Sequence, residues 1–453
     1  MGGAALSKME KVTQAVTEAA NELGFPVLKP EQLEVVTSFL RGRDVFAVLP
    51  TGFGKSLCYA CLPAAFDKIL GKKKGHSIVV VVTPLLAIIH DQVAIKGISS
   101  TYVSGEMSDA ATMDAIFHGK YQLVFFTPEM IINKKHWRRL LGGDVYANRL
   151  KALIIDEAHC VKKWGETFRQ MLLRIGEVRS LIPTSAHVMA LTATATRSDI
   201  SFISRIVGLR NPFVITRVPV IPNLIYAVGL FKSIPETFQN LAQKLVIERN
   251  KFPKTIIYGR SFGVCGDMYL FFKDYLGAAF TNPDDAPDFP EFRLVDMFTS
   301  VTDPAHKSEI IRLFKGDGNL RIVVATMAFG MGVDCPNIRQ IIHVGLPDDI
   351  SSYVQETGRA GRDGKPSRVT LLKARIYHQV DNEYASNTTD CRRGSLFRNI
   401  DNYKHVDLGF NCLCCDICSK SCLCGQCDLR LRLLICYFFQ LITISTAHYS
   451  TLI

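Results

Sequence analysis

Short apolar runs alternate with segments of helical spacing along the first half of the chain. The runs are residues 45–49, 78–82, 122–126, 152–155 and 187–191. Residues 78–82 are entirely β-branched and show no polar alternation, which is typical of a parallel strand buried on both faces. Because strands and helices alternate, the pattern predicts a doubly wound parallel sheet.

A second alternation begins after a proline-rich break at residues 211–222, where we place a domain boundary. Its strand-like runs are residues 255–258, 292–295, 321–325, 340–344 and 368–372. Helical stretches such as residues 265–275 and 305–314 lie between them. The sequence therefore predicts two α/β domains in tandem, over residues 1–212 and 213–385.

The loop after the first run has the composition of a phosphate-binding loop. It contains Thr51, Gly52, Phe53 and Gly54, and Lys55-Ser56 then begins an apolar segment that we expect to be a helix. A glycine loop at a helix N-terminus directs backbone N–H groups at an anion. Lys55 would reach the outer phosphates, and the Ser56 hydroxyl would hold Mg²⁺. The full G-x-x-x-x-G-K-[ST] pattern needs a glycine where this chain has Leu49, so an ordinary glycine turn is the alternative.

An acidic pair, Asp156-Glu157, directly follows the run at 152–155. Ligands bind at the carboxyl ends of strands in open α/β sheets, so this pair is expected near Lys55. Asp156 would hold Mg²⁺, and Glu157 would orient and deprotonate an attacking water. A solvated turn is the alternative for an isolated acidic pair. Upstream, the Gln32 amide could read an adenine edge, although a solvated helix residue is the simpler interpretation of a lone glutamine.

The second domain carries a glycine-rich turn with Arg359 and Arg362. Guanidinium groups stabilise charge on a transferring phosphoryl group, whereas a salt-bridged surface would also explain two arginines. If the nucleotide lies between the domains, hydrolysis requires both of them to close.

Composition adds a basic balance and a cysteine cluster. The chain has 453 residues and a formal net charge of +11, which suits a polyanionic partner such as nucleic acid. No apolar signal region follows the N-terminal residues, and seven of the 14 cysteines lie between Cys412 and Cys427. A dense cluster in a chain without a secretory signal indicates metal ligands rather than disulfides. Cys391, Cys412, Cys415 and Cys418 would suit a structural Zn²⁺ site, while the surplus cysteines Cys414, Cys422, Cys424 and Cys427 leave the ligand choice open.

The motifs together resemble a known family. LPTGFGKSLCY, TPLLAIIHDQV, TPEM, DEAHC, LTATAT, ATMAFGMGVD and QETGRAGRDG occur in this order between Leu49 and Gly364. This series is similar to that of the RecQ-like DNA helicases of superfamily 2. The resemblance implies two RecA-like domains, a zinc-binding subdomain over residues 386–430, and an apolar tail of unknown role over residues 431–453. It further implies an enzyme that hydrolyses ATP with Mg²⁺, moves 3′ to 5′ along single-stranded DNA and unwinds duplexes in recombination and repair.

Site residues follow from the same resemblance. Lys29, Gln32 and Asp334 match ATP-binding positions, and Thr192 and Thr194 match the motif that couples hydrolysis to DNA. Thr83, Pro84, Trp164, Phe168 and Arg169 match DNA-binding positions. Stacking of aromatic rings on bases is a plausible strand contact, and packing beneath a loop is the alternative for Trp164 and Phe168. The four zinc ligands of the family match Cys391, Cys412, Cys415 and Cys418.

Departures from the family pattern keep a second function open. Lys162-Lys163 and Glu166-Thr167 replace the usual residues around Trp164, and Ile221 replaces an arginine. The winged-helix domain expected after about residue 430 is missing, which favours an ATP-gated DNA-binding clamp as the alternative to an unwinding enzyme. An RNA helicase is a third reading. The tail at 433–453 has the length of a membrane span but many polar residues near its end, so we expect a truncated end or packing tail and no membrane partner. Single-stranded and branched or duplex DNA are the expected partners, with a nuclear location in a eukaryote and a cytoplasmic one otherwise.

Overall fold

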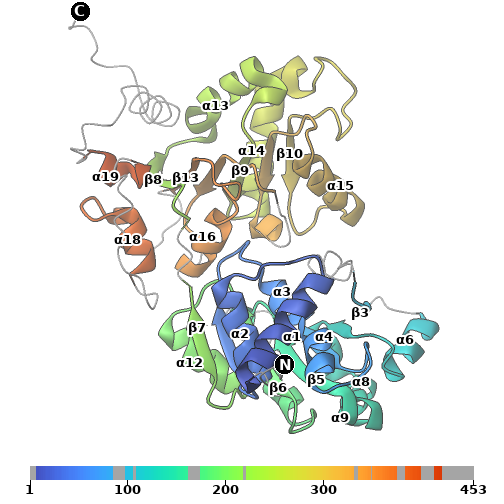
Figure 1. The fold of residues 1–453 in the computed structure, drawn as a ribbon. Coiled ribbons are helices and arrows are strands. Elements are labelled where there is room, and N and C mark those ends of the chain that lie inside the picture. The colour runs from blue at the N-terminus through green and yellow to red at the C-terminus, as the bar shows by residue number, and fades with distance from the viewer. Residues whose placement is uncertain are drawn as a thin grey trace, which may run out of the picture. The chain divides into compact units, whose positions relative to one another are not determined.

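The computed structural model describes residues 7–84, 97–105, 109–161, 174–217, 221–330, 335–347, 349–374, 383–398 and 413–420. The chain divides into two compact units, with the division between residues 219 and 220. Each unit has its own parallel sheet (Figure 1). Each also has its own apolar core. Among the described residues, no helix is long and apolar enough to cross a membrane.

The first unit contains a seven-stranded parallel sheet in the order β3-β4-β2-β5-β6-β1-β7. Its strands are β1 (Val45–Val48), β2 (Ile78–Val82), β3 (Ser100–Val103), β4 (Leu123–Phe126), β5 (Leu150–Ile155), β6 (His187–Thr192) and β7 (Phe213–Thr216). Its helices are α1 (Lys8–Glu22), α2 (Pro30–Leu40), α3 (Lys55–Ala60), α4 (Leu62–Ile69), α6 (Ala110–Phe117), α7 (Pro128–Asn133), α8 (Lys135–Gly142), α9 (Asp144–Arg149), α11 (Gly176–Arg179) and α12 (Arg197–Val207).

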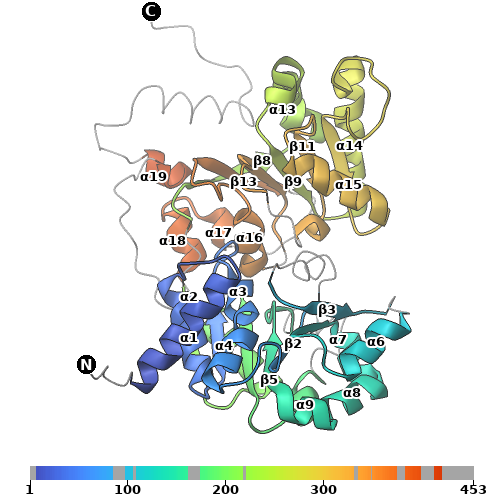
Figure 2. The same ribbon diagram turned by 45° about the vertical axis from the view of Figure 1, so that its right-hand side comes forward.

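Side chains of the first sheet alternate between two apolar layers. Val45 and Ala47 of β1 pack with α1 to α4, whereas Phe46 and Val48 of the same strand pack with α6 to α9, α11 and α12. Successive side chains of a strand point to opposite faces, so a strand that is apolar throughout needs a helical layer on each side. Figure 2 shows the two helical layers on either side of this sheet. The sequence prediction of a doubly wound sheet is confirmed for this unit.

The second unit contains a six-stranded parallel sheet in the order β10-β11-β9-β12-β13-β8. Its strands are β8 (Leu224–Phe231), β9 (Thr255–Gly259), β10 (Val295–Phe298), β11 (Ile322–Ala325), β12 (Gln340–Val344) and β13 (Ser367–Ala374). Its α-helices are α13 (Ile234–Glu248), α14 (Phe262–Leu276), α15 (Pro304–Lys315), α16 (Ile350–Thr357), α17 (Glu383–Ser386), α18 (Arg392–Phe397) and α19 (Asp416–Lys420). Three 3₁₀ turns add η2 (Arg249–Lys251), η3 (Gly277–Phe280) and η4 (Met327–Gly330).

One predicted strand is displaced. Only Val295 of the run at 292–295 lies in a strand, which is β10, Val295–Phe298. The sequence signal is masked by Asp296, a carboxylate in the middle of the strand. Its charge is satisfied by tertiary contacts, since Arg293 Nη1 lies 3.3 Å from Oδ2 and His306 Nε2 lies 3.3 Å from Oδ1. Strands β3, β7 and β8 were also absent from the sequence prediction.

Candidate nucleotide site and cysteine cluster

The phosphate-binding loop lies between β1 and α3. Gly52 and Gly54 have φ values of +76° and +87°, in the left-handed region that glycine adopts most readily. A Cβ atom at Gly54 would lie 2.7 Å from Nε2 of Gln32, so contact as well as backbone conformation requires glycine there. Lys55 begins α3, and its Nζ donates to the carbonyl of Leu49 at 3.3 Å. The loop therefore has the positive charge and the turn geometry that a phosphate chain requires.

Gln32 and Lys29 fasten this loop to the start of α2. The Gln32 Oε1 accepts a hydrogen bond from Lys29 N at 2.9 Å, and its Nε2 donates to the carbonyls of Phe53 and Gly54 at 3.0 and 3.1 Å. Lys29 Nζ donates to the Phe53 carbonyl at 3.2 Å and lies 4.2 Å from the centroid of its ring. The solvated alternative for Gln32 is wrong, because the side chain is buried and braces the loop. Its adenine contact stays a prediction.

The acidic pair follows β5. Asp156 is 4% exposed, and its Oδ2 accepts a hydrogen bond from the Tyr59 hydroxyl at 3.3 Å. Burial and the neighbouring Glu157 raise the pKa of Asp156 to about 6, against the opposing charge of Lys55. Glu157 has φ of +49°, a conformation that is uncommon outside glycine and concentrated at functional sites. A buried carboxylate whose ionisation is disfavoured is a suitable ligand for Mg²⁺, because a cation would restore the charged form.

His159 connects the acidic pair to the end of β6, a link that the sequence analysis did not identify. Its Nδ1 lies 3.3 Å from Glu157 Oε2 and 3.2 Å from Thr192 Oγ1. Burial alone would lower the pKa of His159, but the adjoining Cys160 and Glu157 raise it above its usual value. Thr192 Oγ1 in turn donates to the carbonyl of Thr194 at 3.1 Å. The only available signal was that His159 ends the DEAH motif.

Three motifs meet at one edge of the first sheet because their strands are neighbours. In the order β5-β6-β1, the β6 strand lies between the strand before Asp156 and the strand before the phosphate loop. Leu49 N donates to the Thr192 carbonyl at 2.9 Å, and Ala158 N donates to the Leu191 carbonyl at 2.8 Å. The structure thus gathers Lys55, the acidic pair and the two threonines, as the sequence predicted.

Other predicted residues of this unit lie at the end of β2 or outside the description. Thr83 follows β2, is fully buried, and its N–H donates to the Phe126 carbonyl at 3.0 Å; Pro84 is also buried. Trp164, Phe168 and Arg169 lie outside the described residues, as does Asp334 of the second unit. Their assigned roles remain predictions.

In the second unit the arginine-bearing turn follows α16. The Arg359 N–H donates to the Glu356 carbonyl at 3.3 Å, and Arg362 Nε donates to the Gly358 carbonyl at 3.3 Å. Gly361 has φ of +62°, and its carbonyl accepts a hydrogen bond from Asn223 Nδ2 at 2.8 Å. Arg359 is 4% exposed, so the alternative of a salt-bridged surface residue is wrong for it.

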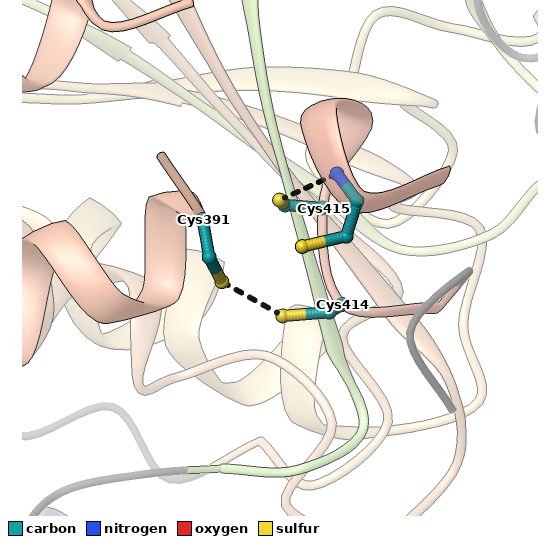
Figure 3. A group of neighbouring side chains, drawn as sticks. Cys391, Cys414 and Cys415 are labelled. Atoms are coloured by element: carbon teal, nitrogen blue, oxygen red, sulfur yellow. Dashed lines mark hydrogen bonds between the residues drawn. The ribbon is translucent and has the colours of Figure 1, made fainter. Parts of the chain in front are cut away.

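Four cysteines of the second unit form a compact cluster. The sulfur atoms of Cys391, Cys414, Cys415 and Cys418 all lie within 4.8 Å of one another. Figure 3 shows Cys391, at the start of α18, pointing towards Cys414 and Cys415; the Cys391 and Cys414 sulfurs are 3.4 Å apart. Hydrogen bonds from the other three cysteines hold the pKa of Cys391 far below its usual value. The donor set fits a tetrahedral thiolate metal site.

The cluster corrects one sequence expectation. Cys414 was treated as surplus, whereas it is a member here; Cys412 lies outside the described residues. Spacing alone does not separate the two, since either gives four thiolates with Cys391, Cys415 and Cys418. In the fold, the Cys414 carbonyl accepts a hydrogen bond from Tyr226 N at 3.2 Å, so the edge of β8 fixes the backbone at this residue.

Comparison with known proteins agrees with this geometry. The chain matches the family "DEAD/DEAH box helicase" over residues 29–202 and "Helicase conserved C-terminal domain" over residues 240–364. It is 28% identical over 405 residues to ATP-dependent helicase SGS1 of Saccharomyces cerevisiae, which covers 81% of this chain and 26% of that protein. It is 31% identical over 369 residues to ATP-dependent DNA helicase Q-like 4B of Arabidopsis thaliana, covering 78% of this chain and 29% of that one.

The chain belongs to the RecQ-like helicases of superfamily 2. It spans less than a third of the length of these two relatives. A solved structure with the same fold is the Mycobacterium smegmatis helicase Lhr bound to ssDNA and AMP-PNP. The TM-score is 0.60 at 18% identity, and the match covers 80% of this chain and 48% of that one. The two parallel sheets are therefore RecA-like domains.

Proposed function

We propose that this chain is the motor of an ATP-dependent DNA helicase, which moves 3′ to 5′ along single-stranded DNA and separates duplexes during recombination and repair. The observation that carries the proposal is the convergence of Lys55 and the Asp156-Glu157 pair at the ends of β1 and β5, on either side of β6, whose Thr192 contacts His159 beside Glu157. A nucleotide-hydrolysis site coupled to a helicase motif is the simplest function for this arrangement.

Each residue has a chemical role in the hydrolysis of ATP. Lys55 binds the outer phosphates, and the raised pKa of Asp156 marks it, with the Ser56 hydroxyl, as a holder of Mg²⁺. The ion supplies charge neutralisation for the phosphates. Glu157 accepts the proton of the attacking water, and His159 holds its carboxylate in place. Arg359 and Arg362 stabilise charge on the transferring phosphoryl group, and Thr194 couples hydrolysis to the DNA strand.

We further infer that the cysteine cluster binds one Zn²⁺ as a closed structural site. The partner is single-stranded DNA joined to duplex or branched DNA, bound with little sequence preference through backbone charge and stacking on Trp164. Work on chromosomal DNA would place the protein in the nucleus of a eukaryote and in the cytoplasm of a bacterium.

The proposal is tested by ATPase rates with and without single-stranded DNA, beside a strand-displacement assay. DNA should stimulate turnover, RNA should not replace it, and a 3′-tailed duplex should be unwound. Glu157→Gln should bind ATP without turning it over, whereas Lys55→Ala should lose nucleotide affinity as well. DNA-stimulated ATPase without displacement would instead establish an ATP-gated clamp, and preferential stimulation by RNA would establish an RNA helicase.

A further inference from the structure

A buried histidine–carboxylate pair lies in the second unit, away from the phosphate loop in sequence. His343 belongs to β12 and Glu356 to α16, and His343 Nε2 lies 2.8 Å from Glu356 Oε2. The two residues are only 2% and 7% exposed. Removing such polar groups from water is costly, and well-packed apolar side chains often stabilise a fold at least as well. The pair therefore needs an explanation other than stability.

Glu356 lies at the start of the turn that carries Arg359 and Arg362. Its carbonyl accepts the hydrogen bond from Arg359 N at 3.3 Å, and α16 ends one residue later at Thr357. Arg362 Nε donates to the carbonyl of Gly358, two residues beyond Glu356. A rotation of the last turn of α16 would therefore displace both guanidinium groups. The hydrogen bond to His343 fixes that turn against a central strand of the sheet.

The His343 ring also packs against two tyrosines, one of which belongs to α16. Its ring stacks on Tyr258, with centroids 4.9 Å apart and an interplanar angle of 23°, and the two residues are paired across β12 and β9. Tyr353 of α16 packs edge-on against the same ring, also at 4.9 Å. Burial raises the pKa of Tyr258, and the charge of Arg359 opposes the rise.

We propose that His343 and Glu356 are positioning residues that aim Arg359 and Arg362. The inference rests on the proposed ATP hydrolysis, in which these arginines stabilise the transferring phosphoryl group. The pair exchanges no proton and touches no substrate in this role. Losing its hydrogen bond should leave ATP binding intact, because the phosphate loop and Lys55 supply most of it. It should lower kcat, since small misplacements of a catalytic group cost about 10- to 100-fold in rate.

The test compares His343→Leu with His343→Gln in the full chain. Leucine removes the donor at similar volume, whereas the glutamine amide can still donate to the Glu356 carboxylate. We expect His343→Leu to lose about 10-fold or more in DNA-stimulated kcat, with the Kd for a fluorescent ATP analogue unchanged within a factor of about two. His343→Gln should recover most of that loss. Glu356→Met should match His343→Leu, and the double variant should be no worse than either, as expected for a coupled pair.

Asp296→Asn is the matched control. Asp296 is another buried carboxylate of the second unit that contacts a histidine, with Oδ1 3.3 Å from His306 Nε2, but it lies on β10. Asp296→Asn should leave kcat unchanged if the inference is right, even where its melting temperature falls. Rates are expressed per nucleotide-binding molecule, so partial unfolding does not imitate a loss of turnover.

The outcomes separate the inference from the function on which it rests. A wild-type chain without ATPase activity overturns both. An active wild type with normal kcat in His343→Leu overturns only the positioning role. Equal losses in His343→Leu and His343→Gln, or an equal loss in Asp296→Asn, would assign the pair to packing and also overturn it.

Discussion

Single residues of this chain carry charge or conformation that only their surroundings explain. Asp156 is a carboxylate in a buried place, and its pKa of about 6 reflects burial beside Glu157 with only partial compensation by Lys55. Glu157 has a φ of +49°, in the left-handed region that is uncommon outside glycine. Such strained or desolvated groups concentrate where chemistry takes place.

The first prediction concerns Gly54 in the phosphate loop. Gly54→Ala should weaken binding of a fluorescent ATP analogue at least about tenfold, because its Cβ would press on the Gln32 amide at 2.7 Å and its φ is +87°. Gly24→Ala is the control, with a φ of +85° but no atom within 4 Å of the added Cβ. It should share the backbone cost of about 1 kcal/mol without changing affinity. Normal affinity in Gly54→Ala would show that the packing of the Gln32 amide against the phosphate loop is unimportant for nucleotide binding.

The second prediction concerns Asp44, which lies just before β1. Its carboxylate accepts hydrogen bonds from Val188 N at 2.8 Å and Arg210 N at 2.7 Å. Burial opposes ionisation, but hydrogen bonds from His187 and these N–H groups, with the charge of Arg179, hold the pKa of Asp44 below its usual value. Asp44→Asn should lower the free energy of unfolding by about 2 kcal/mol, as for hydrogen bonds to charged groups.

The pH dependence of this difference has a fixed sign. Because the folded pKa of Asp44 is lowered, its stabilisation is fully present above the unfolded pKa of about 4 and is lost as pH falls through the folded value. Chemical denaturation of both proteins should therefore show a constant difference at pH 6–8 that closes below about pH 4. Asp109→Asn, at an exposed helix N-cap, is the control and should change little. A difference that grew in acid would contradict the assignment.

At the scale of elements, the cysteine module is an extension of the second sheet. Cys415 forms a parallel bridge with Tyr226 of β8, and Val228 N of the same strand donates to Asp416 Oδ2 at 3.2 Å. The Arg392 guanidinium of α18 binds both oxygens of Asp416. The short helices α18 and α19 are therefore held in position by an edge strand and a buried ion pair as well as by the sulfur cluster.

The third prediction follows from the membership of that cluster. Purified protein should contain about one Zn²⁺ per chain, and Cys414→Ser should lose most of it, as Cys415→Ser should. Cys412→Ser is the comparison that separates the two possible ligand sets. It should keep its zinc, because the fold places Cys414 with the other three sulfurs. Elemental analysis of the purified variants measures their zinc content. Full zinc in Cys414→Ser together with its loss in Cys412→Ser would restore the ligand set expected from sequence.

At the scale of the whole molecule, the chain is two units with separate cores. Buried side chains of the first unit pack on both faces of a seven-stranded sheet, and those of the second pack on its own six-stranded sheet. No residue of the first unit belongs to the cysteine cluster found among the described residues. Removal of a metal should therefore act on one unit alone.

The fourth prediction is a calorimetric one. A zinc chelator should lower the melting temperature of one transition by several degrees and leave the other in place, because metal binding contributes folding free energy only to the unit that holds it. Arg392→Lys, which keeps the charge but loses the bidentate pairing with Asp416, should lower the same transition. A single transition that shifts as a whole would show that the two units unfold together.

The local sequence pattern determined many of the strands and several residues of the candidate site. The runs at 78–82 and 340–344 are strands with the predicted bounds, because uniformly apolar segments bounded by polar turns have few other stable arrangements. Lys55 and the Asp156-Glu157 pair were identified from spacing and from their place after strands. Only the tertiary structure decided where charges could be buried. It placed Asp296 inside a strand by giving it Arg293 and His306, and it joined His159 to Thr192 and His343 to Glu356 across distances that no local pattern records.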